Sequence, residues 1–406
     1  MRTDVSFTRI PQIDRRNAGL LTKIYGIDGC SLNKKLVFVI NDFGFFISHR
    51  LPIALKARDE GFKVWVAAPA REGLPQTLIN LGLNVVSVPL SRRGLNPLAE
   101  LQALWALFRL FQRLKPDLVH LVTIKPVLYG GMAARLAGVP AVVSAVSGLG
   151  TLFTRRVSLL TRVAQVMYKL ALGHKNQAVI LQNTDDLHAL VREGGLDSAK
   201  AVLIRGSGTD LRTFMYAAER EGVPVVVMAS RLLRDKGLIE YLNAARLLVE
   251  RRAVARFLAV GEPDPGNPSS ITEAEWDGWR REGVVEFPGF CADIAQLFAD
   301  SHVVVLPSYR EGLPKVLIEA AACGRAVVTT DVTGCRDAIE TGVTGLLVPL
   351  QDAHALADAI QFLLEHPALR QEMGRAGRAL AERTFSIEGV VNEHIVIYQR
   401  LLKRAQ

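Results

Sequence analysis

The sequence is poor in cysteine and has no long apolar run. Its four cysteines, Cys30, Cys291, Cys323 and Cys335, lie far apart without a C-x-x-C pair, which argues against a disulfide framework or a zinc site and indicates reduced thiols in a cytosolic protein. No apolar run approaches the roughly 18 residues of a membrane-spanning helix. Charges and proline interrupt residues 1–20, so we expect neither a signal peptide nor a transmembrane helix.

Low-complexity runs, internal repeats and recognised nucleic-acid-binding motifs are also missing. The net charge of +9 is uneven: residues 1–212 hold 28 Lys and Arg against 14 Asp and Glu, whereas the remaining residues hold 21 against 26, so the two parts carry +14 and −5. Such a basic half suits an anionic partner. The missing motifs argue against nucleic acid. An anionic membrane, a lipid-linked diphosphate and ordinary solubilising charge remain open.

The alternation of apolar strands with amphipathic helical segments predicts an α/β fold with parallel sheets. With 406 residues, 49% of them hydrophobic, the chain can bury two sizeable cores. We predict a loose extension at 1–33, doubly wound Rossmann-like domains at 34–212 and 213–385, and a final helix at 386–406. Ligands bind at the carboxyl ends of the strands in such sheets, so we expect the two domains to face each other across one cleft.

The segment Glu311–Glu319 is the most informative part of the chain. It follows an apolar strand, so Glu311 stands in a loop and Glu319 about one turn inside the next helix, whose first turn suits Pro314. Carboxylates accept hydrogen bonds from vicinal hydroxyls and helix N-termini attract phosphate, a combination that suits a sugar nucleotide. Two solvated glutamates are the alternative for this spacing alone. The neighbouring residues 308–314 and 320–324 favour the binding site.

A second motif, Ser230–Gly237, follows the first strand of the second half. Arg231 and Lys236 lie there in a strand-to-helix loop. Two such cations can neutralise a diphosphate, arginine by forked contacts and lysine as a point charge. They can also stabilise a departing nucleotide diphosphate without a metal, so we expect neither a metal nor a cofactor. Solvated surface cations are the alternative.

These motifs, in this order, resemble glycosyltransferase family 4. The matching residues are Arg231 with Lys236, Glu311 with Glu319, Gly261-Glu262, Gly289 with Asp293, and Gly334-Cys-Arg-Asp337. The resemblance covers nearly the whole chain after Lys34. It implies the two-domain GT-B fold and sugar transfer with retention of the anomeric configuration. It also implies that Arg231 and Lys236 hold the donor diphosphate, that Glu319 binds the ribose, and that the donor sugar meets Glu311 and Gly312, with Leu313 and Gly261 beside it.

Motifs of the first half resemble those of bacterial enzymes that build O-antigen, capsule or protein-linked glycans on undecaprenyl diphosphate. They are Phe45–Pro52, Thr123–Gly130, Ser147–Gly150, Gln182–Asp186 and Gly206–Asp210. The resemblance implies that the basic first domain binds a lipid-linked saccharide acceptor at the cytoplasmic face of the membrane. The donor is expected to be a nucleotide sugar, with uridine as base and a hexose or N-acetylhexosamine as sugar.

Several residues of the first half are acceptor-site candidates. Ser147 and Gly148 belong to one of the matching motifs. Asp42 follows the first strand and either acts as a base for the acceptor hydroxyl or caps the next helix. His49 and Arg50 either meet an acceptor phosphate or lie on the surface.

The chain departs from many family members at a His-x-His motif. His120 keeps the first histidine, whereas Val122 replaces the second, which would contact the donor sugar. Thr123 or Lys125 could take part of that role. His120 is either a catalytic contact or a satisfied core residue. Residues 155–175, basic and apolar, either lie on anionic lipid or form a core helix with one wet face.

Two further classes of function remain open. Non-hydrolysing sugar-nucleotide epimerases share this two-domain fold, so the fold alone does not identify a transferase. A non-catalytic module that binds a nucleotide sugar is the other alternative. The retained cation pair and both glutamates argue against such a module.

Overall fold

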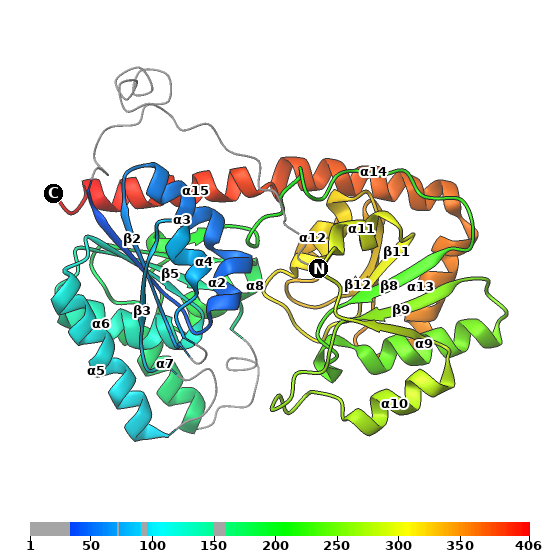
Figure 1. The fold of residues 1–406 in the computed structure, drawn as a ribbon, viewed down its shortest axis with the longest axis horizontal. Coiled ribbons are helices and arrows are strands. Elements are labelled where there is room, and N and C mark those ends of the chain that lie inside the picture. The colour runs from blue at the N-terminus through cyan, green and yellow to red at the C-terminus, as the bar shows by residue number, and fades with distance from the viewer. Residues whose placement is uncertain (1–32, 71–72, 91–95, 150–158) are drawn as a thin grey trace, which may run out of the picture.

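Two parallel β-sheets organise the protein, one in each half (Figure 1). The computed structural model describes residues 33–70, 73–90, 96–149 and 159–406. The predicted extension at 1–33 lies outside this part except for Asn33, and so do Cys30, Arg155 and Arg156. The predicted class, α/β with two doubly wound sheets, is confirmed.

The first sheet has seven strands in the order β3-β2-β1-β4-β5-β6-β7. They are β1 (Lys35–Val39), β2 (Lys63–Ala68), β3 (Asn84–Ser87), β4 (Leu118–Val122), β5 (Ala141–Val146), β6 (Gln177–Leu181) and β7 (Ala201–Leu203). Strands β4, β5 and β6 are buried along their whole length. Helices cover both faces of this sheet, and for that reason its central strands are continuous apolar runs in the sequence.

Helices of the first domain pack on two separate cores, one on each face of the sheet. One face carries α2 (Phe43–His49), α3 (Leu51–Asp59) and α4 (Gln76–Asn80). The other carries α5 (Pro97–Leu114), the π-helical turn η3 (Pro126–Gly130), α6 (Gly131–Leu136), α7 (Leu159–Ala171) and α8 (Thr184–Arg192). Side chains alternate along β1 accordingly: Leu36 and Phe38 enter the first core, Val37 and Val39 the second.

The second sheet has six strands in the order β10-β9-β8-β11-β12-β13. They are β8 (Val225–Ala229), β9 (Arg256–Val260), β10 (Glu286–Gly289), β11 (Val303–Leu306), β12 (Ala326–Thr330) and β13 (Gly345–Val348). The surrounding helices are α9 (Leu238–Glu250), α10 (Glu273–Glu282), α11 (Ile294–Ala299), α12 (Lys315–Ala322), α13 (Ala353–Glu365) and α14 (Pro367–Thr384). Two cores flank this sheet as well.

The chain passes between the domains twice, and the two passages lie side by side. Thr209 forms a parallel bridge with Ser386, accepts a hydrogen bond from Ile387 N and donates one to Phe385 O. At Gly208 φ is +78°, and a Cβ there would lie 2.8 Å from Ile387 Cα. Glycine is therefore needed where the passages touch.

After the second passage, α15 (Ile387–Lys403) returns to the first domain and packs along α3 (Figure 1). Its side chains Val391, Tyr398 and Leu401 join the first-domain core. Ser386 caps the helix by accepting from Gly389 N at 3.2 Å. The periodicity of 386–406 predicts a helix, but the pattern alone does not reveal which domain covers its apolar face.

The carboxyl ends of the two sheets face each other. Loops after β5 and β6 touch the loops that follow β11 and β12. The loops in which ligands bind in open α/β sheets therefore meet between the domains. Over the described ranges, no helix combines the length and the apolar character that crossing a bilayer requires.

Candidate active site

The loop 308–314 joins β11 to α12 and carries Glu311. Glu311 Oε1 accepts from Ser308 Oγ at 2.7 Å and forms an ion pair with Lys236 Nζ. The side chains of Glu311 and Lys236 are only 13% and 23% exposed. The alternative of a solvated glutamate at this position is therefore excluded.

Lys236 reaches Glu311 because the loop that carries it approaches β11 closely. It ends the short 3₁₀ turn η5 (Arg234–Lys236), and Gly237 follows with φ +77°. A Cβ at Gly237 would collide with the carbonyl of Pro307. The glycine thus lets the loop after β8 lie against the end of β11, so that a cation from one strand meets a carboxylate from the next.

Arg231, the second predicted phosphate ligand, forms an ion pair with Asp264. Its side chain is 47% exposed. At Gly261 φ is +139°, and a Cβ there would collide with the carbonyl oxygen of Ser230, so the loops after β8 and β9 pack backbone to backbone. Asp264 was not predicted as a partner, because the spacing along the sequence does not show that these loops touch.

Glu319 lies inside α12 and is 8% exposed. Burial raises the pKa of its carboxyl, an effect that Lys315 opposes by pairing with Glu319 Oε1 at 2.9 Å. Leu313, which the resemblance places beside the donor, is buried and packs against Gly206. Its side chain thus anchors the loop 308–314 in the core of the second domain.

The first domain meets this loop at Gly312. A Cβ at Gly312 would lie 2.5 Å from Ser147 O and 2.6 Å from Gln182 Oε1. Asn183 Nδ2 donates to Gly312 O at 2.8 Å. A Cβ at Gly148 would lie 3.5 Å from Gly312 Cα. The structure therefore brings together Ser147, Gly148 and Gly312, which the sequence had assigned to opposite sides of one site.

A buried ion pair next to this contact was not predicted. Arg310 Nη2 lies 2.5 Å from Asp186 Oδ1, and Asp186 is fully buried in the first turn of α8. Asp186 Oδ2 also accepts from Asn183 Nδ2 at 3.0 Å and from Leu149 N at 3.3 Å. The motif Gln182–Asp186 contributed to the resemblance, but its spacing gave no sign of a partner in the other domain.

His120 lies in the core, away from the loops between the domains. It is fully buried on β4, with Nδ1 2.6 Å from Tyr398 Oη, and its ring centroid lies 5.6 Å from that of His394. Burial lowers the pKa of His120 well below its usual value. The expected catalytic contact is wrong: His120 is a core residue, although its buried Nε2 has no hydrogen-bond partner within the described part of the chain.

The prediction for Arg50 is also wrong. It was a candidate for an acceptor phosphate, but it is 2% exposed, and its Nη1 donates to His49 O at 3.0 Å. Burial lowers its pKa to about 10, and the nearby Tyr398 opposes that shift. Both corrections have one cause, because α15 covers this part of the first domain and the sequence did not predict that contact.

Asp42 and His49 keep a place at the edge of the site. Asp42 accepts from Phe45 N at 2.7 Å and so caps α2, as one of its two alternatives requires. His49 is half-buried and stacks on Phe45 with ring centroids 4.0 Å apart. The pKa of His49 is lowered to about 4. Burial is the main cause, and the positive charges of Arg50 and Lys315 lower the pKa further. Lys315, which contributes to this shift, belongs to α12 of the second domain.

Thr123 and Lys125 differ in what they offer a ligand. Thr123 has φ +75°, a rare conformation for a β-branched residue, and its buried hydroxyl has no hydrogen-bond partner within the described part of the chain. Lys125 Nζ instead pairs with Glu100 at 2.5 Å, and both side chains are about 15% exposed (15% and 14%). Lys125 is therefore held in an ion pair, as Lys236 is, and both Thr123 and Lys125 stay candidates.

Known families and structures match both domains. Residues 35–183 match the family "Glycosyl transferase 4-like" and residues 223–366 match "Glycosyl transferases group 1". Together with the two facing sheets, these matches define a two-domain glycosyltransferase. The chain belongs to glycosyltransferase family 4 and has the GT-B fold. Of the three classes of function that the sequence left open, the family matches support the transferase and not the epimerase or the non-catalytic module.

Two curated relatives act on lipid-linked sugars, according to their names. The N,N'-diacetylbacillosaminyl-diphospho-undecaprenol alpha-1,3-N-acetylgalactosaminyltransferase of Campylobacter jejuni is 28% identical over 382 residues, which cover 88% of this chain and 98% of that protein. The UDP-Gal:alpha-D-GlcNAc-diphosphoundecaprenol alpha-1,3-galactosyltransferase of Escherichia coli is 25% identical over 286 residues, 67% of this chain and 73% of that one.

Solved structures share the fold at lower identity. Sucrose-phosphate synthase from Thermosynechococcus elongatus superposes with a TM-score of 0.77 at 22% identity, covering 92% of this chain and all (100%) of that one. Anabaena HepE in complex with UDP and glucose gives a TM-score of 0.72 at 21% identity, covering 90% and 100%. These likenesses support the GT-B architecture.

Proposed function

We propose that this chain transfers a hexose or N-acetylhexosamine from a uridine-diphosphate sugar to a saccharide carried on a polyprenyl diphosphate, with retention and without a metal, at the inner face of the cell membrane. The observation that carries the proposal is the contact of Gly312 with Ser147 and Gly148, beside the Lys236–Glu311 pair. The acceptor class is supported by the names of the Campylobacter and Escherichia relatives.

The donor binds by an exchange of anions. Lys236 and Arg231 are each paired with a carboxylate, Glu311 and Asp264. A nucleotide diphosphate replaces these partners with phosphate oxygens of the same sign, so neither cation is left uncompensated. The carboxylate of Glu311 is then released to accept hydrogen bonds from the sugar hydroxyls, and Glu319 accepts those of the ribose.

The chemical step breaks the bond between the anomeric carbon and the diphosphate oxygen. The electron pair leaves with the diphosphate, whose charge Lys236 and Arg231 stabilise. The acceptor hydroxyl forms the new bond on the same face, and its proton passes to the departing phosphate oxygen. We favour this path over a covalent intermediate because Ser308 and Lys236 both engage Glu311, the carboxylate of the loop 308–314.

The acceptor approaches from the first domain. Ser147 and Thr123 carry buried hydroxyls without hydrogen-bond partners in the described ranges, and each follows a strand that ends at the interface. A saccharide hydroxyl or a phosphate oxygen would supply the missing partner. The contact between the domains at Gly312 keeps water from the reacting carbon, which matters because donor hydrolysis is the competing reaction.

The test is a donor panel. The purified chain is incubated with UDP-, GDP- and dTDP-sugars and a synthetic polyprenyl-diphosphate saccharide, with and without EDTA. Mass spectrometry identifies the product, and NMR gives its anomeric configuration. We expect one UDP-hexose or UDP-N-acetylhexosamine to react, to keep its configuration and to be insensitive to EDTA. Inversion, or transfer only to soluble acceptors, would contradict the proposal.

A further inference from the structure

The outer face of α5 is unusually apolar for an exposed helix. Leu98, Leu101 and Trp105 are 78%, 62% and 60% exposed. Their spacing of three and four residues places them on one side of the helix, opposite the buried Ala103 and Leu107. The first turns of α5 are therefore apolar on the core side and on the outer side.

The charges on α5 are all positive at its surface. Its one acidic residue, Glu100, turns inward to the ion pair with Lys125 and is 14% exposed. Arg109 and Arg113 continue the outer line of the helix after Trp105, and the guanidinium of Arg109 lies 4.9 Å from the centre of the Trp105 ring. Within the described ranges, no carboxylate forms an ion pair with either arginine.

Helix α7 repeats this combination. Val163, Val166 and Leu170 are 48%, 58% and 47% exposed. Arg162 and Lys169 lie among them, and the helix contains no acidic residue. Both α5 and α7 pack on η3 and α6, and Figure 1 shows them on the same side of the first domain.

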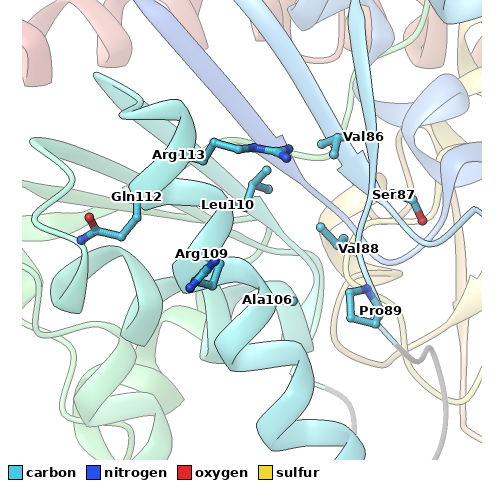
Figure 2. A pocket seen from close by; sticks show the side chains of 9 residues that line it. All are labelled: Val86, Ser87, Val88, Pro89, Ala106, Arg109, Leu110, Gln112 and Arg113. Atoms are coloured by element: carbon cyan, nitrogen blue, oxygen red, sulfur yellow. The ribbon is translucent and has the colours of Figure 1, made fainter.

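A groove of about 540 Å³ between β3 and α5 borders this surface. Val86, Val88 and Leu110 line it, and Figure 2 shows Arg113 extending from α5 toward Val86. The groove thus combines apolar walls with a basic rim, as a lipid with an anionic headgroup requires.

The surface also lies on the appropriate side of the active site. In a parallel sheet, the helix after a strand begins at the carboxyl edge of that strand. The apolar start of α5 follows β3, and α7 follows β5, so both begin near the edge that faces the second domain. Ser147, a proposed acceptor contact, follows β5 at this same edge and precedes α7 in the chain.

We propose that the outer faces of α5 and α7, which we call the α5–α7 face, dock on an anionic lipid bilayer. The inference rests on the proposed function, because a lipid-linked acceptor brings the enzyme to a membrane. Charge complementarity selects this occupant: the face has exposed apolar and basic side chains and no exposed acid on either helix. Each basic side chain at the surface and each inserted apolar one adds to membrane affinity.

The test uses the full chain and vesicles of phosphatidylcholine with or without phosphatidylglycerol. We expect the wild type to float with the anionic vesicles, and less so at high salt. The variant Leu98→Ser/Leu101→Ser/Trp105→Ser should lose about tenfold or more in vesicle partitioning, and Arg109→Gln/Arg113→Gln about tenfold.

Two control variants match these changes on the second domain. Val249 and Val254 are 49% and 73% exposed, and Arg280 lies 5.1 Å from the Trp276 ring, as Arg109 does with Trp105. Val249→Ser/Val254→Ser and Arg280→Gln should float like the wild type. Equal flotation of the α5 variants and the wild type would overturn the docking face.

Turnover of a short-chain acceptor in detergent separates the two proposals. The α5 variants should keep wild-type turnover there, because none of their changed residues belongs to the site. If the wild type glycosylates no acceptor but still needs the α5–α7 face to float, the proposed function fails and the docking face stands. A change of oligomeric state without a change in flotation would identify the face as a subunit contact and overturn membrane docking.

Discussion

The two domains differ in whether the polar side chains near their interface already have a partner. On the second domain, Arg231, Lys236 and Lys315 each hold a carboxylate of the same site. On the first domain, the hydroxyls of Thr123 and Ser147 are buried without a partner in the part of the chain described. An unsatisfied buried hydroxyl costs about 1–3 kcal/mol, whereas a paired ion only exchanges its partner. We infer that the donor side is preformed and that the acceptor completes the other side.

The largest expected effect comes from Lys236→Ala. In the proposed mechanism this cation stabilises the leaving diphosphate, and its removal also takes away the ion-pair partner of Glu311 in an enclosed position. We expect kcat/KM for the donor to fall about a thousandfold, roughly 4 kcal/mol of transition-state stabilisation. Steady-state kinetics with a saturating acceptor measures this.

Arg234→Ala is the matched control for that change. Arg234 lies two residues away, and its ion pair with Glu275 is directed toward α10. We expect kcat/KM within about threefold of the wild type, because a partly exposed ion pair contributes little. Equal losses in both variants would show that loop disturbance, and not charge on the diphosphate, explains the effect.

Asp186→Asn tests the connection between the two sides. The fully buried carboxylate holds Arg310, and an amide leaves that guanidinium without an anion. We expect a loss of about 3 kcal/mol in the free energy of unfolding, and a tenfold to hundredfold fall in kcat/KM caused mainly by a higher donor KM. Urea unfolding and kinetics together measure this. His188→Gln, at an exposed position of the same helix, should change neither.

The two domains are also expected to differ in how their stability depends on pH, because the first-domain core contains two buried histidines, His120 and His394. Burial lowers the pKa of His394 to about 3 and that of His120 well below its usual value, and both lie in the first-domain core. The unfolded chain therefore binds more protons below about pH 6.5, and stability falls as the pH falls from there toward 3. For His394 alone, the loss between pH 6.5 and 5 is about 2 kcal/mol.

His394→Gln should reduce this acid sensitivity. Urea unfolding of the wild type and the variant at pH 7 and pH 5 measures the difference, and His354→Gln, at an exposed position of α13, is the control. Hydrogen exchange at pH 5 should show the first domain opening before the second. An identical pH slope in all three proteins would contradict the assignment.

The smallest effect is expected for Thr123→Gly. Thr123 adopts φ +75°, which costs a β-branched residue about 1 kcal/mol that glycine does not pay. We expect stability to hold or rise by up to about 1 kcal/mol while turnover of the lipid-linked acceptor falls. Thermal unfolding measures the change in stability, and acceptor kinetics measure the change in turnover. A stable variant with full activity would remove Thr123 from the acceptor site.

The sequence predicts well what lies within one strand-loop-helix unit. Apolar runs reveal the buried strands of both sheets, and charged residues shortly after those strands include Lys236 and Glu311, which the structure brings together. Arg231 lies in the same loop as Lys236 but pairs with Asp264. Parallel topology converts these short-range patterns into a shared edge. The two-domain α/β class follows in the same way.

Contacts between distant segments were not predictable from such patterns. The burial of His120 and Arg50 depends on Tyr398 of α15, and the pairing of Arg310 with Asp186 depends on how the domains meet. Nothing in the local spacing of these residues reports a partner more than a hundred positions away. Asp264 was missed for the related reason that two neighbouring loops touch backbone to backbone.

The return of α15 to the first domain affects the order of biosynthesis. Tyr398 and Leu401 cover Phe62 and His120, so a nascent chain of 385 residues still lacks part of its N-terminal core. Every strand of the second sheet and helix α14 precede α15 in the chain. The half that is translated first is therefore the half whose core is completed last.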